Sequence, residues 1–476
     1  MSAYYVNSFD VNMDEKSFSR FLNSGSLDGY FSYDEFWKFF EDVRGTSNNG
    51  VFISPTYNIG KSYQGRDMKG FYLCDNTSQL HNYQKEKNIV FITSLHHPRE
   101  PLSLTMVMLI IREVVKSLKE TGHNQIKEMM RDSMIFMIPV VNPDSYIYIN
   151  KNFYGPDSDQ IKMVRKNRHT IAICAPWLGG VDLNRNYDMK FGADEDGSSS
   201  DPCKEDYRGT HPFSEPETLA IKNYVDAHPK IVSNVNIHTF GNSWIYPFNY
   251  VHDKQNHLLE KKYRLYFDFY KDFTDSMKRK HLSALFGNAF FALDYTTNGE
   301  AGDWFTGKKK ILNIDLELGN LDRKSESFYP PQSILADIVR YNWLAMSEFL
   351  SKHSIDFSHK VVIYPSQINF ELINNGLSAL IDPALSFEYL TSSNQPVRVS
   401  DTKYCIKNVL EDHCQSWKRF NNKITETIGG RHVLEIQLGF ADKNEYARFG
   451  SMKMIIQRPR LYMNYKDQCY LFKKSN

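Results

Sequence analysis

Short apolar segments that alternate with helix-like segments restrict the fold of this chain more than any other feature. Four of them contain a run of β-branched and aromatic residues typical of a buried strand: KNIVFITS (87–94), SMIFMIPVVNPD (133–144), KIVSNVNIHTF (230–240) and KKKILNIDLELG (308–319). Strands that alternate with helices predict an α/β fold. We expect a central mixed, mostly parallel twisted sheet flanked by helices.

Apolar residues at helical spacing predict the helices between these strands. They occur in YDEFWKFFEDV (33–43), LSLTMVMLIIREVVKSLKE (102–120) and SILADIVRYNWLAMSEFLSKH (333–353). A fourth helix is predicted in SEPETLAIKNYVDAH (214–228). Its first residues have the spacing of a capping box between Ser214 and Glu217, with Pro216 inside the first turn.

The pattern changes at both ends of this α/β region. Residues 1–29 are polar with few apolar anchors, so we expect an N-terminal extension. After residue 354, period-two apolar patterning between Gly-, Asn- and Pro-rich turns replaces helical spacing, for example in GRHVLEIQLGF (430–440). The sequence therefore predicts an α/β domain over 30–354 and a small all-β, sandwich-like domain over 358–476. No motif assigns a role or a partner to this second domain.

Composition excludes several classes of partner. The chain is 41% hydrophobic and 24% charged, which is typical of a soluble globular protein. Its net charge of +1 gives no field that would attract nucleic acid or a membrane surface. The apolar run MVMLII (106–111) ends at Arg112, so no membrane span is expected. The N-terminus shows no signal peptide.

Two histidines and a glutamate follow the first predicted strand, in SLHHPRE (94–100). Glu100 lies four residues after His96 and three after His97, so the spacing does not choose between the two histidines. Catalytic zinc needs three protein ligands and one open position, and His238, at the end of another predicted strand, could be the third. Ligands bind at strand ends in α/β folds, which favours a metal site over an ordinary polar loop.

Further strand-end segments bring polar groups suited to peptide chemistry. They are Arg165 in MVRKNR, Asn184 and Arg185 in GVDLNRNYD, Tyr295 in DYTTNGEAGDW and Glu317 in DLELG. Each alone also has a structural interpretation. Arg165 could belong to a solvated charge run, and Glu317 could pair with a lysine of the preceding KKK. Their combination and order favour the functional interpretation.

In this order the residues resemble the zinc carboxypeptidases of the carboxypeptidase A/B type, over roughly residues 30–352. HPRE fits the ligand motif His-x-x-Glu of that family, with His97 and Glu100. The segments VNPDSY (141–146), GVDLNRN (180–186), GTHPFSEPE (209–217) and IHTFGNSWIYP (237–247) match further family motifs. Tyr295 lies eight residues before Asp303-Trp304, as the tyrosine of that family does.

This resemblance implies a zinc-dependent exopeptidase, a metalloprotease that removes the C-terminal residue from peptides or proteins. His97, Glu100 and His238 would hold one Zn²⁺, which would activate water and polarise the scissile carbonyl. Glu317 would act as general base, and Arg165 would stabilise the oxyanion.

Other residues would bind the substrate. Asn184 and Arg185 would clamp its terminal carboxylate, because a bidentate guanidinium suits a planar carboxylate. Tyr295 would cover the bound end as a mobile lid. Arg99 would contact substrate farther from the cut.

The position that sets side-chain preference in that family is Gly302 here. Glu300 lies close by, and Asp315 is two residues before Glu317, on the same face of the predicted strand. Two acids near the pocket predict a preference for a terminal Lys or Arg. Phe240 stands where the digestive enzymes carry Tyr, and no essential group is lost with that change.

The resemblance also bears on the cysteines. Cys174 and Cys203 stand at positions that secreted members join by a disulfide, which implies an oxidising, secretory or lysosomal-type compartment. The pairing of Cys74, Cys405, Cys414 and Cys469 stays open. Asn76-Thr77-Ser78 is an N-glycosylation sequon, a tripeptide that also occurs by chance in chains of this length.

Three alternatives stay open. The first is a catalytically silent or regulatory binding protein on the same fold, which would be expected to lose a ligand or Glu317. The second is an intracellular carboxypeptidase that trims protein tails, whose β domain would precede the catalytic core. The third is a related amidase acting on cell-wall peptides or small acyl-amino acids, which Asn184, Arg185 and Tyr295 disfavour.

Overall fold

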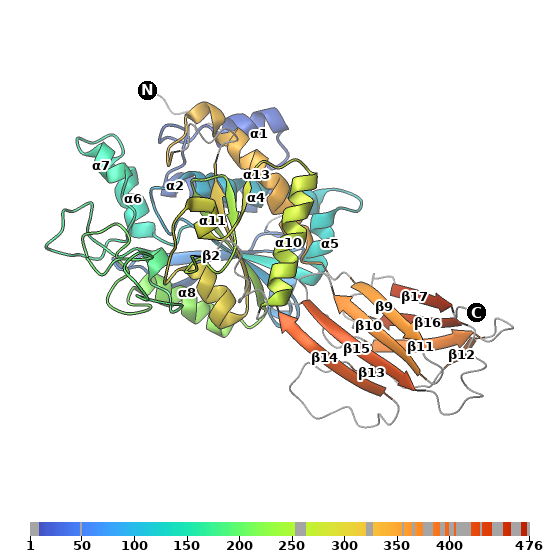
Figure 1. Ribbon diagram of the computed structural model, residues 1–476. Coiled ribbons are helices and arrows are strands. Elements are labelled where there is room, and N and C mark those ends of the chain that lie inside the picture. The colour runs from blue at the N-terminus through green and yellow to red at the C-terminus, as the bar shows by residue number, and fades with distance from the viewer. Residues whose placement is uncertain are drawn as a thin grey trace. The chain divides into compact units, whose positions relative to one another are not determined.

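The computed structural model describes residues 9–47, 50–252, 263–319 and 327–354, and beyond them the strands between 357 and 473 (Figure 1). The chain divides into two compact units, Met1–Ser354 and Ile355–Asn476. Of the helices in the described ranges, none is long and apolar enough to cross a lipid bilayer.

An eight-stranded mixed sheet forms the centre of the first unit, with the order β1-β2-β4-β3-β5-β8-β6-β7. The strands are β1 Tyr57–Lys61, β2 Asp67–Leu73, β3 Asn88–Ser94, β4 Ser133–Ile138, β5 Ile231–Thr239, β6 Ser243–Ile245, β7 Leu285–Gly287 and β8 Leu312–Leu318. Strands β4, β3, β5 and β8 are parallel neighbours, whereas β1–β2, β2–β4 and β6–β8 are antiparallel. The predicted mixed α/β sheet is confirmed.

Helices pack around this sheet (Figure 1). They are α1 Glu15–Leu22, α2 Tyr33–Thr46, α3 Leu80–Glu86, α4 Leu102–Lys119, α5 Gln125–Asp132, α6 Pro143–Asn152, α7 Ser158–Lys162, α8 Pro216–Ala227, α10 Arg264–Arg279, α11 Ala289–Leu293, α12 Ala301–Trp304 and α13 Leu335–Ser351. Short helical turns are η1 Thr77–Gln79, η2 Leu183–Arg185, η3 Phe305–Lys309 and η4 Gln332–Ile334.

Burial on both faces explains the uninterrupted apolar run of β3 at residues 89–92. Every residue of β3 and β5 is buried. Alternate side chains of β3, Ile89 and Phe91, share one apolar cluster with Ile221 of α8 and Trp304 of α12. Helix α4 packs against β3 and β5, and α13 packs against α4. A sheet covered in this way does not need the polar–apolar alternation of a half-exposed strand.

Helix α8 begins differently from the predicted capping box. Its N-cap is Glu215, which makes no side-chain cap. The Ser214 hydroxyl donates to the Glu215 carboxylate at 2.8 Å instead. The Glu217 carboxylate accepts from the backbone N–H of Tyr63 at 2.9 Å and from Asn167 Nδ2 at 3.2 Å. The predicted capping box is therefore wrong, because Ser214 is bonded to Glu215 and Asn186, and Glu217 is bonded to residues remote in sequence.

Residues 9–29 are part of the first unit and not an extension of it. Most of their few apolar side chains, among them Phe9, Phe18 and Leu22, are buried. The carboxylate of Glu15 at the start of α1 also lies 2.8 Å from Arg112 of α4 and 2.7 Å from Arg340 of α13. Sparse apolar anchors suggested an extension, but ion pairs to two helices hold this segment as well.

The second unit consists of antiparallel strands wherever it is described. The strands are β9 Phe357–Ile363, β10 Gln367–Asn374, β11 Ala384–Leu390, β12 Pro396–Arg398, β13 Tyr404–Cys405, β14 Phe420–Ile428, β15 Arg431–Gly439, β16 Ser451–Gln457 and β17 Gln468–Lys473. One sheet has the order β14-β15-β10-β9; the other has β12-β11-β16-β17, with β13 beside β11. The period-two pattern correctly predicts strands here, and a sandwich packing of the two sheets stays a prediction.

The disulfide implied by the resemblance is present. Cys174 and Cys203 are joined, with their Cα atoms 5.3 Å apart. Cys74 is a buried free thiol. The side chains of Cys405, Cys414 and Cys469 lie outside the described residues.

Candidate active site

The candidate site lies at the carboxyl ends of β3, β5 and β8. Residues 95–100 follow β3, and His238 lies near the end of β5. In the register of the sheet His238 is paired with Glu317 of β8. Because parallel strands end at the same edge, three segments far apart in the sequence meet there.

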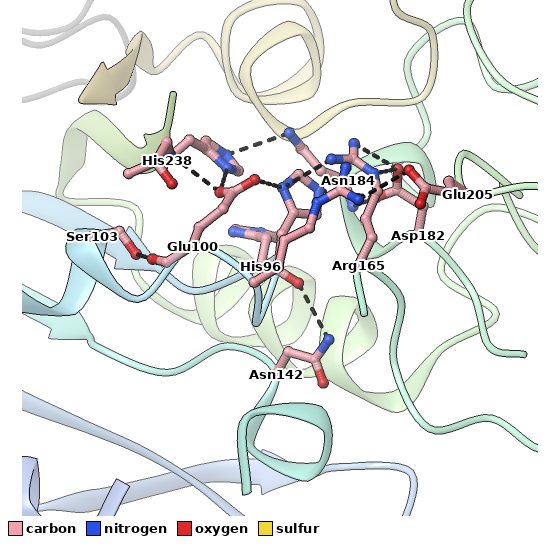
Figure 2. Close-up of polar contacts among 12 residues, drawn as sticks. His96, Glu100, Ser103, Asn142, Arg165, Asp182, Asn184, Glu205 and His238 are labelled. Atoms are coloured by element: carbon pink, nitrogen blue, oxygen red, sulfur yellow. Dashed lines mark hydrogen bonds and ion pairs between the residues drawn. The ribbon is translucent and has the colours of Figure 1, made fainter. Parts of the chain in front are cut away.

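His97, Glu100 and His238 form a buried cluster, of which Figure 2 labels Glu100 and His238. His97 Nδ1 lies 2.8 Å from one oxygen of the Glu100 carboxylate, and His238 Nδ1 lies 2.9 Å from the other. Candidate ligand atoms of all three residues lie within 4.8 Å of one another. One cation could therefore contact all three at once. Two imidazoles and a carboxylate are a common ligand set for catalytic zinc.

Asp182 gives this cluster the orientation that a metal requires. Its Oδ1 lies 3.1 Å from His97 Nε2, where it can accept a hydrogen bond from a proton-bearing Nε2 and so leave Nδ1 available as the metal-binding nitrogen. Burial opposes ionisation of Asp182, but Arg165 and His97 outweigh it and hold its pKa well below the usual range. The residues present thus fit a zinc ion. Sequence reasoning quoted Asp182 only as part of GVDLNRN and assigned it no role.

His96 does not belong to the ligand cluster. It is fully buried, and its Nε2 lies 2.9 Å from the Tyr187 hydroxyl. The geometry therefore separates two histidines that spacing alone left open: His97 faces Glu100, and His96 faces Tyr187.

Arg165 lies next to the cluster and is held rigidly. Its Nε and Nη2 each donate to Asp182 Oδ2 at 2.8 Å (Figure 2). Its Nη1 lies 3.3 Å from His97 Nδ1. Burial disfavours the charged guanidinium, but the charges of Asp182 and Glu100 raise the pKa of Arg165 above its ordinary value. A fixed positive charge therefore stands beside the candidate metal ligands.

Glu317 brings a second carboxylate to the same edge of the sheet. It is half-buried, and its carboxylate makes no hydrogen bond to the described part of the chain. Burial, followed by the negative charges of Glu100 and Asp315, raises its pKa well above the ordinary value, while Arg165 and Arg185 oppose this. An unpaired carboxylate with a raised pKa is suited to taking up a proton.

A cavity of about 290 Å³ opens between these groups and contains every predicted site residue except Gly302. On one side Arg185 donates from Nε to the carbonyl oxygen of Gly197 at 2.9 Å and from Nη1 to that of Asn184 at 2.8 Å. Asn184 Oδ1 accepts from the backbone N–H of Ala301 at 3.0 Å. Tyr295 lines the cavity with 49% of its surface exposed. The amide and the guanidinium are thus oriented by hydrogen bonds, whereas the tyrosine is half-exposed.

Two acids, Glu300 and Asp315, also line the cavity. Asp315 is buried and neither of its carboxylate oxygens has a hydrogen-bond partner among the described residues. Burial, followed by the charge of Glu300, raises the pKa of Asp315 well above its ordinary value. Glu300 accepts from Asn249 Nδ2 at 2.8 Å. A Cβ on Gly302 would stand 2.6 Å from Asp315 Oδ2, so any side chain at this position would collide with the acid.

Arg99 lies at the mouth of the cavity and contacts residues that sequence reasoning missed. Its Nη1 donates to Glu205 Oε2 at 3.0 Å, and its guanidinium lies 4.2 Å from the centre of the Phe328 ring. Phe240 packs edge-on against Phe328 with ring centres 4.9 Å apart. No local pattern marks Phe328 or Glu205, because each joins the site only through the fold.

Comparisons with known proteins agree with this geometry. A family model described as "Zinc carboxypeptidase" matches residues 49–345. Mouse carboxypeptidase A1 is 25% identical over 329 residues, which is 67% of this chain and 68% of its own length. A protein of Talaromyces stipitatus described as "Inactive metallocarboxypeptidase ecm14" is 27% identical over 199 residues, covering 40% of this chain and 31% of its own length.

A solved structure shares the fold of the first unit. Bovine thrombin-activatable fibrinolysis inhibitor, solved in complex with tick carboxypeptidase inhibitor, superposes with a TM-score of 0.54 and 23% identity. The alignment covers 69% of this chain and 98% of that chain. This chain spans about half to two thirds of the length of the first curated relatives. Since the family model matches more than half of the chain, the protein belongs to the zinc carboxypeptidase family, a family of metal-dependent hydrolases.

Proposed function

We propose that this protein is a zinc-dependent exopeptidase that releases the C-terminal residue of peptides or proteins. The observation that carries the proposal is one cavity lined by the His97, Glu100 and His238 cluster, an unpaired Glu317 and the Arg185 guanidinium. A catalytically silent protein on this fold would be expected to lack a ligand or the base. The presence of His97, Glu100, His238 and Glu317 around one cavity supports an active enzyme.

The chain's own residues would divide the chemistry among them. His97, Glu100 and His238 hold the zinc ion, which supplies a Lewis acid for amide hydrolysis when bound. Glu317 takes a proton from the attacking water and returns it to the leaving amine. Arg165, held by two bonds to Asp182, stabilises the negative charge that develops on the scissile carbonyl oxygen.

Three groups would recognise the end of the substrate chain. Arg185 and Asn184 bind the terminal carboxylate, and this explains why a chain end is distinguished from an internal peptide bond. The exposed Tyr295 closes over the bound residue and donates its hydroxyl. Arg99, stacked on Phe328, contacts substrate on the other side of the cut.

The cavity also supports a preference for C-terminal Lys or Arg. Ile245, Ala289 and Leu293 line it together with Glu300 and Asp315. Apolar side chains suit the aliphatic stem of a basic residue, and the carboxylates suit its cationic head. Gly302 keeps a side chain from pressing against Asp315, which lines the cavity.

The Cys174–Cys203 disulfide supports a location in an oxidising compartment, secreted or lysosomal in type. Peptides and proteins of such a compartment would be the substrates.

Metal analysis combined with peptide hydrolysis tests the proposal. We expect one zinc ion per purified full chain and faster release of C-terminal Arg or Lys than of Phe. Glu317→Gln should keep the zinc and lower kcat by about 10²- to 10⁴-fold, as expected for loss of a general base. Glu41→Gln is the matched control, at an acid of α2 whose side chain is 61% exposed. It should change neither the zinc content nor kcat.

Two outcomes would contradict different parts of the proposal. Bound zinc with unchanged activity in Glu317→Gln would refute the assigned mechanism. A faster release of Phe than of Arg would refute the preference for basic residues and leave the exopeptidase function standing.

A further inference from the structure

The sequon Asn76-Thr77-Ser78 has no part in the proposed active site, and it is the only Asn-x-Ser/Thr tripeptide of the chain. It lies in the turn between β2 and α3. Thr77 fixes this turn to the preceding loop: its backbone N–H donates to the carbonyl oxygen of Val51 and its hydroxyl to that of Gly50, both at 2.7 Å. These two hydrogen bonds define the conformation of the turn. The orientation of its side chains therefore bears on whether Asn76 can be modified.

The Asn76 side chain uses only its oxygen. Oδ1 accepts from the Ser78 backbone N–H at 3.0 Å and from the Ser78 hydroxyl at 2.8 Å. Nδ2 makes no hydrogen bond to the described part of the chain, and the side chain is partly exposed. A group attached to Nδ2 would therefore break no hydrogen bond of the folded protein.

The surface around Asn76 is polar. Ser78, Gln79, His81 and Asn82 are exposed, and no large exposed apolar side chain lies between residues 74 and 87. A hydrated oligosaccharide would cover no packing surface there.

The sheet register separates this turn from the active site. Leu73 at the end of β2 is paired with Ile135 of β4, and Ile135 is paired in parallel with Val90 of β3. The end of β2 is thus level with the start of β3, whereas His97 follows the end of β3. From Val90 to Ser94 the strand extends about 13 Å toward the active-site edge. A group at Asn76 would leave the substrate cavity open.

We propose that Asn76 carries an N-linked glycan. The inference rests on the proposed secretory location, because the transferase and the oxidising conditions that form the Cys174–Cys203 disulfide belong to the same compartment. The co-reactant is a lipid-linked oligosaccharide pyrophosphate. The bond between Nδ2 and the anomeric carbon forms, and the bond between that carbon and the phosphate oxygen breaks. Nδ2 loses one proton, and the lipid pyrophosphate leaves with the electron pair.

Expression of the full chain behind an added secretory leader in eukaryotic cells tests the proposal. Protein from the medium should lose mass on treatment with peptide N-glycosidase, and that enzyme should convert Asn76 to Asp, as read by peptide mass spectrometry. Asn76→Gln and Ser78→Ala should both abolish the mass shift. Ser78→Thr should retain it, and Asn82→Gln, at a neighbouring exposed Asn outside any sequon, is the matched control.

Two results would overturn the proposal. One is secreted wild-type protein with the Cys174–Cys203 disulfide formed and Asn76 unmodified. The other is a glycosidase-sensitive shift that persists in Asn76→Gln. Because the turn lies away from the substrate cavity, the deglycosylated enzyme should keep its kcat/KM within twofold. Loss of exopeptidase activity in every sample, glycosylated or not, would instead count against the proposed function alone.

Discussion

His238 of β5 and Glu317 of β8 are paired in register on adjacent parallel strands, so their side chains leave the sheet on the same face. Asn236 and Asp315 form the pair two residues earlier, on that same face. One strand pair therefore positions a candidate metal ligand, the candidate base and the acid of the specificity pocket. Changes in these residues should separate into distinct effects on metal binding, on turnover and on side-chain preference.

His97→Ala should abolish stoichiometric zinc binding, whereas His96→Ala should retain it. The reason is that His97 Nδ1 faces Glu100, while His96 Nε2 faces the Tyr187 hydroxyl. Metal content of the purified proteins by atomic emission, after dialysis against a weak chelator, measures the difference. Zinc lost from His96→Ala and kept by His97→Ala would reverse the assignment of the two histidines.

Asp182→Asn should weaken zinc binding about 10- to 100-fold, the usual effect of losing a group that orients a histidine ligand. Asp182 also accepts two bonds from Arg165, so kcat should fall further than metal occupancy explains. Competition with a fluorescent zinc chelator gives the affinity, and turnover at saturating zinc gives kcat. An unchanged zinc affinity would show that the bond between Asp182 and His97 does not set the ligand geometry.

Asp315→Asn should lower kcat/KM for C-terminal Arg about 10- to 100-fold, because a hydrogen bond to a charged group contributes roughly 1.5–3 kcal/mol. Hydrolysis of the matching Phe peptide by the same variant is the internal control and should change little. Equal losses for both peptides would indicate that Asp315 supports the fold of the pocket and does not read the substrate side chain.

His353 should make the first unit less stable in acid. Burial lowers the pKa of this histidine from 6.5 to about 4 in the folded protein. The unfolded chain therefore binds more protons between these values, and stability falls as the pH drops from 6.5 toward 4. The free energy of unfolding should fall by about 3 kcal/mol over the whole pH range of this effect. Denaturant unfolding followed at several pH values should show a shallower pH slope for His353→Gln than for wild type, and equal slopes would contradict the prediction.

Glu217 should make the first unit less stable as the pH rises, which is the opposite of the effect of His353. Burial raises the pKa of its carboxyl from 4.5 to about 7, despite hydrogen bonds from Tyr63 and Asn167. The folded protein binds more protons between these values, so its contribution is fully present below pH 4.5 and is lost as the pH rises through 7. The change amounts to about 3 kcal/mol. Glu217→Gln should remove this loss of stability, as measured by thermal unfolding between pH 5 and 8. If stability falls with pH as steeply in the variant as in wild type, the prediction is wrong.

The elements of the fold were predictable because they depend on local patterns. The apolar runs at 87–94 and 230–240 became β3 and β5, and helical spacing at 102–120 became α4. The start of α8 was not predictable, since Glu217 is bound by Tyr63, which is 154 residues away. For the same reason residues 9–29 looked like an extension, although Glu15 forms ion pairs with two distant helices.

The amino-acid sequence by itself determined the α/β class, the candidate ligand types and the segments that carry them, because side-chain period and strand ends are local properties. The family motif already named His97 as the ligand, but only the tertiary structure decided that Asp182 lies against its Nε2, that His96 faces Tyr187, and that Asp315 lies unpaired beside Gly302. Glu100 and His238 are 138 positions apart, yet their atoms lie 2.9 Å from each other. The pairing of parallel strands creates that contact, and no local pattern contains it.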